Sequence, residues 1–188
     1  MPGICDPGEN IVSKVKLNGL DVICIPGACA AITALVSSGM TSSKFVFEGF
    51  LPRKKIDREK VLFEISKSEK TTIVYESPHR LKKLLQELLV FCGGEREIVV
   101  ARELTKKFEE HVGNNIDDVI IFFKDKEVIG EITLVVKGKS IEKNQEINKE
   151  DLKRDLNELI KAGLSLSAAS KYLAKKNGIK IGVIYNLY

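Results

Sequence analysis

Two short segments pair an acidic with a basic residue in a way that suits chemistry on a charged substrate. Glu76 and Arg80 lie four residues apart in YESPHR, and Arg102 and Glu103 follow the apolar run at 97–101. A carboxylate can accept a proton, and a guanidinium can hold a phosphate through two hydrogen bonds. A structural interpretation competes with this one, because such pairs also fix turns and most charge runs are solvated surface.

A third segment, PGACAAITA at 26–34, is built from small residues. Small side chains let the backbone approach a ligand closely, and the first turn of a following helix offers unpaired amides. Tight packing of a helix on a sheet explains the same composition. A fourth segment, GEITLVV at 130–136, indicates a buried strand with a small polar start.

Other kinds of site lack their sequence patterns. The chain has no Walker loop, GxGxxG, GxSxG or HExxH motif, which argues against the enzyme classes that these motifs define. Its four cysteines form no CxxC pair and have no histidine at metal spacing, so we expect reduced thiols and no metal site.

The elements that must position these segments alternate along the first three quarters of the chain. Periodicity predicts helices and strands that end at Gly, Pro or Asn signals, and their alternation predicts an α/β fold with a mostly parallel, mixed sheet flanked by helices. The expected strands span 21–25, 44–47, 71–76, 97–101 and 132–137, and the expected helices 9–17, 28–38, 56–65, 81–89 and 116–123.

The remainder of the chain has a different character. Residues 139–149 are polar and predict a linker, and 150–188 predict a small helical domain, either a helix-turn-helix or a plain hairpin. Residues 1–138 hold 20 Lys and Arg against 20 Asp and Glu, so the last 50 residues carry the whole net charge of +4. A basic tail suits a polyanionic partner, although a solvated helix face gives the same count.

Composition limits the setting. The 188 residues are 44% hydrophobic and 30% charged, without a membrane-length apolar run or a signal stretch, which predicts a cytoplasmic globular protein that does not bind membranes. The chain opens in a Gly- and Pro-rich loop, MPGICDPG, and we interpret this start as an internal boundary.

Taken together and in order, six motifs resemble the ribosomal RNA small subunit methyltransferase I family of the tetrapyrrole methylase superfamily. They are PGICDPG, PGACAAITAL, FEGFLPRK, YESPHRL, ARELTKKFEE and GEITLVVKG, and they span residues 1 to about 138. The helical tail is similar to the small C-terminal domain of the same family. Two departures are the HVGN turn at 111–114, where the family has an Arg-Gly-Thr-like turn, and the weakly basic end IGVIYNLY.

The resemblance implies a homodimeric enzyme that binds S-adenosylmethionine between two lobes. It implies 2′-O-methylation of a cytidine in the decoding region of 16S rRNA in the small ribosomal subunit, with no DNA partner. The family has a further TPIGN-type strand and loop ahead of MPGICDPG. We therefore expect 1–138 to be the end of the N-terminal lobe plus the C-terminal lobe.

Site residues follow from the same resemblance. It places the cofactor against Pro26, Ala28, Ala30, Ala31, Tyr75 and Thr133. It places Glu76, Arg80, Arg102 and Glu103 around the cleft, with either carboxylate as base and either arginine on RNA phosphate. Lys106 or Lys107 can instead steer the RNA backbone electrostatically.

Two other functions stay open. One keeps the fold but methylates a tetrapyrrole or another small substrate, for which the basic tail has no evident use. The other makes this chain a non-catalytic module for RNA binding or dimerisation. RNA retention by residues 139–188 alone discriminates the module from the enzyme.

Overall fold

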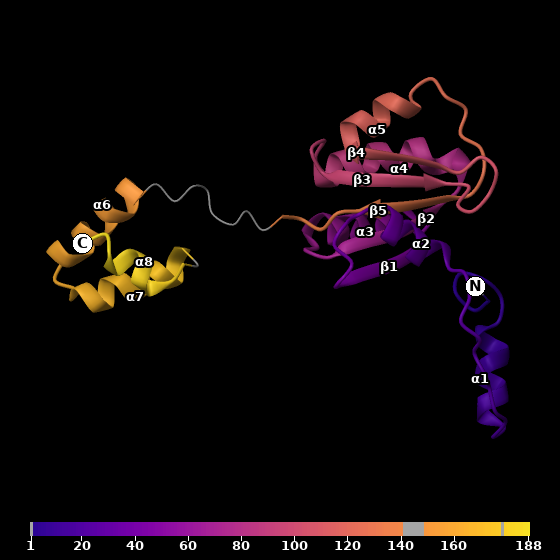
Figure 1. Cartoon of the computed structure of the whole chain (residues 1–188), viewed down its shortest axis with the longest axis horizontal. Helices are drawn as coiled ribbons and strands as arrows, with labels where there is room; N and C mark the ends of the chain where they lie inside the picture. Colours follow the sequence, from indigo (N-terminus) through magenta and orange to yellow (C-terminus); the bar gives the residue numbers. More distant parts are fainter. Residues whose placement is uncertain (1, 141–148, 178) are drawn as a thin grey trace. The chain divides into compact units, whose positions relative to one another are not determined.

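The computed structural model describes residues 2–140, 149–177 and 179–188, and it divides the chain into two compact units, Met1–Lys139 and Ser140–Tyr188 (Figure 1). The predicted domain boundary after residue 138 falls beside this division. The predicted linker at 139–149 lies almost entirely outside the described residues.

The first unit alternates helices and strands, and nearly all expected elements are present. Their order is α1 (Glu9–Leu17), α2 (Ala30–Ser37), β1 (Phe45–Phe50), α3 (Lys55–Lys67), β2 (Thr71–Glu76), α4 (Pro78–Cys92), β3 (Glu97–Arg102), β4 (Glu110–Asn115), α5 (Ile116–Phe123) and β5 (Ile132–Val136). Strand β4 was not expected, because its sequence EHVGNN has no alternating apolar pattern.

The five strands form one mixed sheet in the order β1-β2-β5-β3-β4, which confirms the α/β class. The prediction of a mostly parallel sheet is wrong. Only β1 and β2 are parallel, whereas β2 with β5, β5 with β3, and β3 with β4 are antiparallel. Strand β5 runs opposite to both of its neighbours, and periodicity alone carries no information on strand direction.

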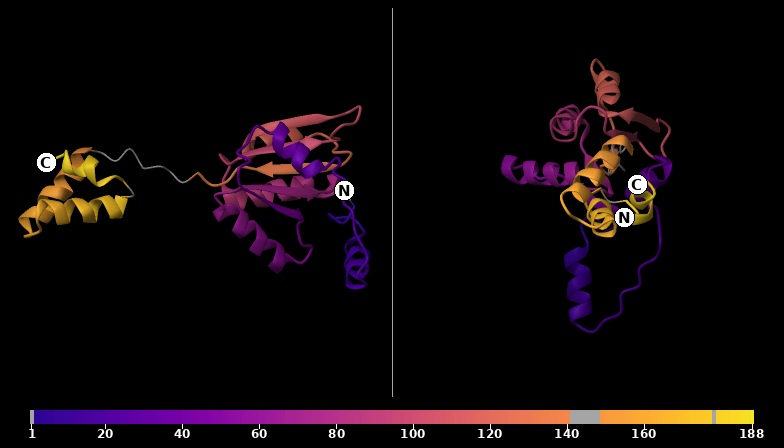
Figure 2. Two further views of the ribbon diagram at one scale, coloured as in Figure 1. Left: turned by 60° about the horizontal axis from the view of Figure 1, so that its bottom comes forward. Right: turned by 90° about the vertical axis from the view of Figure 1, so that its left-hand side faces the viewer.

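Helices cover both faces of the sheet, as Figure 2 illustrates. One face packs on α3, α4 and α5, through leucines such as Leu62, Leu84 and Leu88 against Val74 and Leu134. The other face packs on α2 through a smaller core of Ala31, Ala34, Leu35, Ile73, Ala101 and Val135. Neighbouring strand residues alternate between the two cores, as a pleated strand requires.

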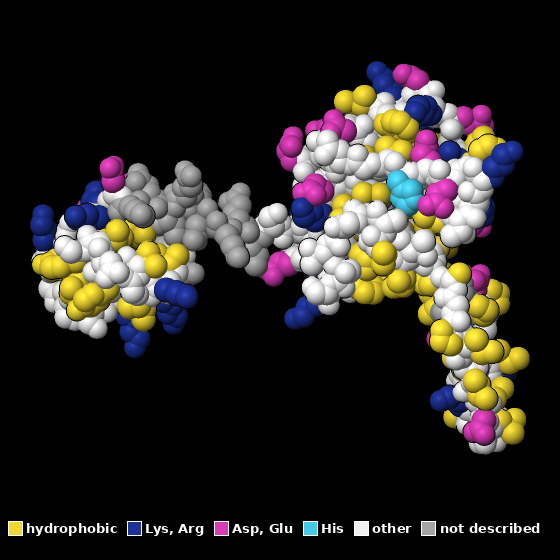
Figure 3. Space-filling model, in the orientation of Figure 1, with side chains coloured by type: hydrophobic (Ala, Val, Ile, Leu, Met, Phe, Trp, Pro, Cys, Tyr) yellow, Lys and Arg dark blue, Asp and Glu magenta, His cyan; other side chains and the backbone are white. Residues whose placement is uncertain are grey.

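The expected strand at 21–25 is wrong. These residues have no regular secondary structure, and Ile23 and Ile25 are 87% and 81% exposed. Apolar side chains alone do not make a strand, since the backbone also needs a partner strand, and none among the described residues pairs with this segment. Figure 3 shows the exposed hydrophobic side chains of the N-terminal segment, and α1 has no buried residue.

The second unit is helical, as expected. It contains α6 (Lys149–Lys161), α7 (Leu166–Asn177) and α8 (Ile181–Tyr185). Its own core is made by Leu152, Leu156, Ala169, Leu173, Ala174 and Ile184. Within the described parts of both units, no helix is long and apolar enough to cross a membrane.

Candidate active site

The ends of three neighbouring strands meet at one edge of the sheet. β2 ends at Glu76 and β3 ends at Arg102, and the antiparallel β5 begins at Ile132. The strand register pairs both Glu76 and Arg102 with Ile132, from its two sides. The two acidic–basic pairs predicted from sequence therefore lie at the same edge, flanking the start of β5.

A cleft of about 420 Å³, the main cleft of the candidate site, opens at this edge. Three of the six residues predicted to bind the cofactor line it, namely Ala30, Tyr75 and Thr133. The other lining residues are Ile4, Cys5, Asp6, Phe50, Glu76, Ser77, Pro78, Gly130, Glu131 and Ile132. The cleft thus combines apolar side chains such as Ile4, Phe50 and Ile132 with polar ones such as Asp6, Glu131 and Thr133, so it offers both kinds of contact to a small molecule.

The remaining three predicted cofactor residues, Pro26, Ala28 and Ala31, line a second cleft of about 520 Å³. Ile4 lines both clefts, so the two adjoin. The PGACAAITA segment therefore lines the second cleft, although the strand predicted before it does not form.

Tyr75 connects the two clefts. Its hydroxyl oxygen accepts a hydrogen bond of 3.1 Å from the backbone N–H of Ala31, in the first turn of α2. Its ring packs against Phe47 and Phe50, with centroids 5.0 and 5.7 Å away. Burial raises the pKa of the phenol, so it stays protonated and neutral near pH 7.

A bulge in β1 accounts for these aromatic contacts. Residues three apart on a regular strand point to opposite faces, yet Phe47 and Phe50 both contact Tyr75. The pairing with β2 shifts between Phe47 and Gly49, so β1 holds one extra residue at this point. The extra residue lets the side chains of Phe47 and Phe50 point to the same face of the sheet. Gly49 has a φ of +62°, and a Cβ there would lie 2.7 Å from the Cys5 sulfur.

Glu76 is the centre of a buried ion network. Its Oε1 lies 2.7 Å from Arg80 Nη2, and its Oε2 lies 3.3 Å from Arg58 Nη2. The backbone N–H of Ser77 also donates to Oε1 over 2.9 Å, and Arg58 Nε reaches Glu87 over 2.7 Å. Glu76 thus fixes the turn from β2 into α4 and orients two guanidinium groups.

Arg102 and Glu103 are held by different partners. Arg102 Nε lies 3.1 Å from Glu110 Oε2, and its Nη1 donates to the Ile129 carbonyl over 3.1 Å. Glu103 adopts a left-handed φ of +51°, which costs a non-glycine residue free energy. Its Oε1 accepts hydrogen bonds from the Glu131 N–H at 2.8 Å and from Lys106 Nζ at 3.0 Å.

These contacts set the charges at this corner of the site. The hydrogen bond from the Glu131 N–H, followed by that from Lys106, lowers the pKa of Glu103. The Glu103 and Glu131 carboxylates in turn raise the pKa of Lys106. Gly130, which lines the main cleft, has a φ of +91°, and a Cβ there would lie 2.5 Å from Glu103 Cγ. Glu103 therefore packs directly beside the cleft wall.

Sequence reasoning missed three residues of this site. Arg58 looked like one charge among many on α3, and it is buried only because Glu76 and Glu87 pair with it. Phe50 and Glu131 were parts of motifs without an assigned role. Among the described residues, no group of three or more His, Cys, Asp or Glu is placed to hold a metal ion.

The comparisons first define the class of protein. The family model of the Tetrapyrrole (Corrin/Porphyrin) Methylases matches residues 1–120, so the chain belongs to this family. Two solved structures show the same fold. The methyltransferase CobJ has a TM-score of 0.54 and 17% identity over 73% of this chain and 61% of its own. Cobalt precorrin-4 methyltransferase CbiF has a TM-score of 0.52 and 15% identity over 69% and 57%.

The curated relatives identify one family of methyltransferases within this class. Ribosomal RNA small subunit methyltransferase I of Synechocystis sp. is 40% identical over 99% of this chain and 67% of its own length. The Vibrio cholerae relative of the same name is 42% identical over 98% and 64%. The family is therefore that of ribosomal RNA small subunit methyltransferase I, and the chain spans about two thirds of the length of these relatives.

Proposed function

We propose that this chain forms part of an enzyme that transfers a methyl group from S-adenosylmethionine to the 2′-hydroxyl of a cytidine in the decoding region of small-subunit rRNA. One observation carries the proposal. The six residues predicted to hold the cofactor lie between 26 and 133 in sequence, yet they line two adjoining clefts. The name of the curated relatives, ribosomal RNA small subunit methyltransferase I, supports rRNA of the small subunit as the substrate.

The residues at the clefts fit such a cofactor. A volume of about 420 Å³ lies within the range of roughly 300–1,000 Å³ found for small-molecule sites. Ala28, Ala30 and Ala31 leave room for close approach, and Tyr75 and Thr133 offer a ring and a hydroxyl. When bound, S-adenosylmethionine supplies an electrophilic methyl group on a sulfonium sulfur.

The ribose hydroxyl must lose its proton during transfer, and the two candidate carboxylates differ in their suitability. Glu76 is buried and bonded through both oxygens to Arg58, Arg80 and the Ser77 N–H. We therefore assign Glu76 a positioning role. Both side-chain contacts of Glu103 use Oε1, and in the described structure Oε2 remains available to accept a proton. Glu103 is the proposed base, although its lowered pKa makes it a weak one.

The basic residues of the site have complementary roles in this proposal. Arg80 is part of the network of Glu76 but keeps 31% of its side chain exposed, which suits a contact to RNA phosphate. Arg102 is held by Glu110 and the Ile129 carbonyl and orders the loop beside Glu103. Lys106 bridges Glu103 and Glu131, and Lys107 is the freer candidate for steering RNA.

The test is methyl transfer from labelled S-adenosylmethionine to isolated small ribosomal subunits, followed by nuclease digestion to detect 2′-O-methylcytidine. The chain is assayed beside an extended version that has the full length of the curated relatives. Label in 2′-O-methylcytidine supports the proposal. Label in another nucleotide, or transfer to a tetrapyrrole but not to rRNA, contradicts the proposed substrate.

The second unit supports a second candidate, an RNA-binding module. It has its own hydrophobic core, and residues 139–188 carry the whole net charge. RNA retention by this unit at low salt supports the module, and loss of retention removes it. The homodimer implied by the family resemblance and the cytoplasmic location predicted from composition remain predictions, to be checked by solution mass and by cell fractionation.

A further inference from the structure

A third cleft, of about 650 Å³, borders the main cleft of the candidate active site. Phe50 and Ser77 line both. The rest of its wall is Leu51, Pro52, Arg53, Arg58, Arg80 and Lys83, so it holds four cationic side chains and no carboxylate. Such a concentration of one sign beside an active site attracts an anion.

The charges of this third cleft are only partly neutralised. Arg58 and Arg80 are paired with Glu76 and Glu87 behind the wall. The Lys83 side chain is 73% exposed, and its Nζ lies 3.9 Å from Glu87 Oε1, which is a long distance for an ion pair. Arg53 has no ion pair among the described residues. Four cations against two carboxylates leave an excess of two positive charges, on the outer residues Arg53 and Lys83.

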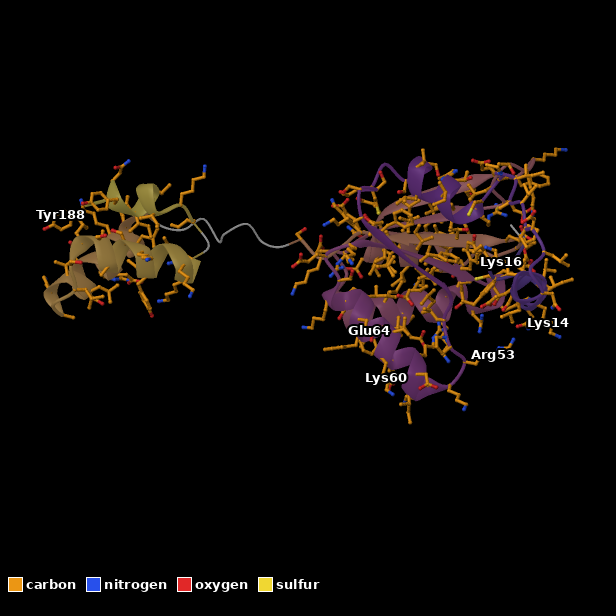
Figure 4. The ribbon with its side chains drawn as sticks, turned by 90° about the horizontal axis from the view of Figure 1, so that it is seen from below. Lys14, Lys16, Arg53, Lys60, Glu64 and Tyr188 are labelled. Atoms are coloured by element: carbon orange, nitrogen blue, oxygen red, sulfur yellow. The ribbon has the colours of Figure 1, made fainter. Side chains whose placement is uncertain are left out.

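Figure 4 shows Arg53 on the loop between β1 and α3, whereas Lys60 and Glu64 lie on α3 itself. Arg53 is therefore close to the end of β1, where Phe50 is the last residue. The chain thus places an unpaired guanidinium three residues after an aromatic ring. Lys60 offers a basic residue of the same region that does not line the third cleft.

Phe50 stands at the border of the main and third clefts with 52% of its surface exposed. The bulge at Gly49 turns its ring to the same face as Phe47, and Tyr75 supports it at 5.7 Å. An exposed ring held from behind costs little entropy when a flat ligand stacks on it. Proteins bind single-stranded RNA by stacking its bases on such rings while basic side chains hold the phosphates.

We infer that the third cleft binds single-stranded RNA next to the nucleotide that is methylated, with a base stacked on Phe50 and phosphates held by Arg53 and Lys83. This inference rests on the proposed function, because it takes RNA to be the substrate. A duplex keeps its bases stacked on one another, so it cannot offer one to Phe50. The cleft therefore selects an unpaired stretch of rRNA.

The experiment measures binding of a fluorescently labelled single-stranded RNA, about ten nucleotides long to match the span of such sites, to the 188-residue chain. Each variant has a matched control on the same element or of the same exposure. Phe50→Leu is compared with Phe63→Leu, whose ring is 55% exposed on α3. Arg53→Gln is compared with Lys60→Gln, and Lys83→Gln with Lys82→Gln, the preceding residue of α4.

We expect Phe50→Leu to weaken binding about tenfold, as loss of one stacked base does. Arg53→Gln and Lys83→Gln are each expected to weaken binding and to reduce the slope of log affinity against log salt by about 0.7. The three controls are expected to bind like the unmodified chain, and duplex RNA more weakly than single strands. Equal affinity of each variant and its control, or no RNA binding by the unmodified chain at low salt, overturns the inference.

Methyl transfer by the extended protein separates this inference from the proposed function. If the unmodified extended protein methylates rRNA and Phe50→Leu and Phe63→Leu bind RNA equally, only the RNA site is wrong. If RNA binding depends on Phe50 and Arg53 but S-adenosylmethionine yields no methylated rRNA, the RNA site stands and the proposed reaction is wrong.

Discussion

Arg80 Nη2 lies 2.7 Å from Glu76 Oε1, across the turn that joins β2 to α4. Both residues come from the YESPHR motif, and Arg58 of α3 meets the other carboxylate oxygen. The sequence alone does not decide whether this pair is a salt bridge or part of a catalytic group. In the structure, both residues belong to a buried ion network. The network holds two guanidinium groups, Arg58 and Arg80, in the wall of the third cleft.

The first prediction concerns the stability that this network provides. Glu76→Gln removes the buried charge that faces Arg58 and Arg80, while Glu87 still pairs with Arg58, and we expect the free energy of unfolding to fall by about 1–3 kcal/mol. Urea denaturation measures the change. Glu64→Gln, on the exposed part of α3, is the control and is expected to stay within about 0.5 kcal/mol. Equal losses in both variants contradict a structural role for Glu76.

The second prediction concerns catalysis. In the extended enzyme, Arg102→Ala and Glu103→Ala are each expected to lower kcat/KM for methyl transfer at least about tenfold, because one loses the order of the loop and the other loses the base. Glu127→Ala removes an exposed acid from the neighbouring loop and is expected to leave kcat/KM unchanged. Unchanged kcat/KM in the first two variants removes both residues from the site.

The third prediction concerns the wall between Glu103 and the main cleft. Gly130→Ala introduces a Cβ 2.5 Å from Glu103 Cγ, so it must displace that side chain. We expect reduced methyl transfer at saturating RNA. Gly93→Ala places an alanine at a similar positive φ of +83°, but with no atom within 4 Å of its Cβ. A loss of activity in both variants instead indicates backbone strain as the cause.

The fourth prediction concerns pH. The pKa of Glu103 is lowered from an ordinary value of 4.5, so its stabilising contacts are complete above about pH 4.5 and are lost as pH falls through the lower folded pKa. Glu103→Gln is therefore expected to lower the thermal unfolding midpoint at pH 7, and to lower it by a smaller amount at pH 3. Scanning calorimetry at the two pH values measures this, and an equal shift at both contradicts it.

Most helices and strands could be predicted from the sequence, because helix periodicity and the apolar runs at 71–76 and 132–136 are strong signals. These two runs are the strands β2 and β5, whose ends line the candidate site. Sequence reasoning missed β4 because EHVGNN is stabilised by pairing with β3 rather than by burial. It predicted a strand at 21–25, where the apolar residues have no partner strand.

The site was predictable only where a motif drew attention to it. Of the residues predicted to bind the cofactor, Tyr75 and Thr133 lie near strand ends, as do both acidic–basic pairs. Arg58 gave no such signal, since its importance depends on a distance to Glu76 that exists only after α3 has packed on the sheet. The role of Phe50 depends on the parity change at Gly49, and a register shift of one residue cannot be read from composition.

The position of β5 in the sheet has a consequence for synthesis. β5 is the last strand of the first unit to be made, yet it lies between β2 and β3. The β1–β2 pair and the β3–β4 hairpin can form as they emerge from the ribosome, but they cannot join until residue 136 has emerged. The sheet of the first unit thus closes only when its last strand is made, and until then the β2 and β3 strands each keep an open edge to which other chains can pair.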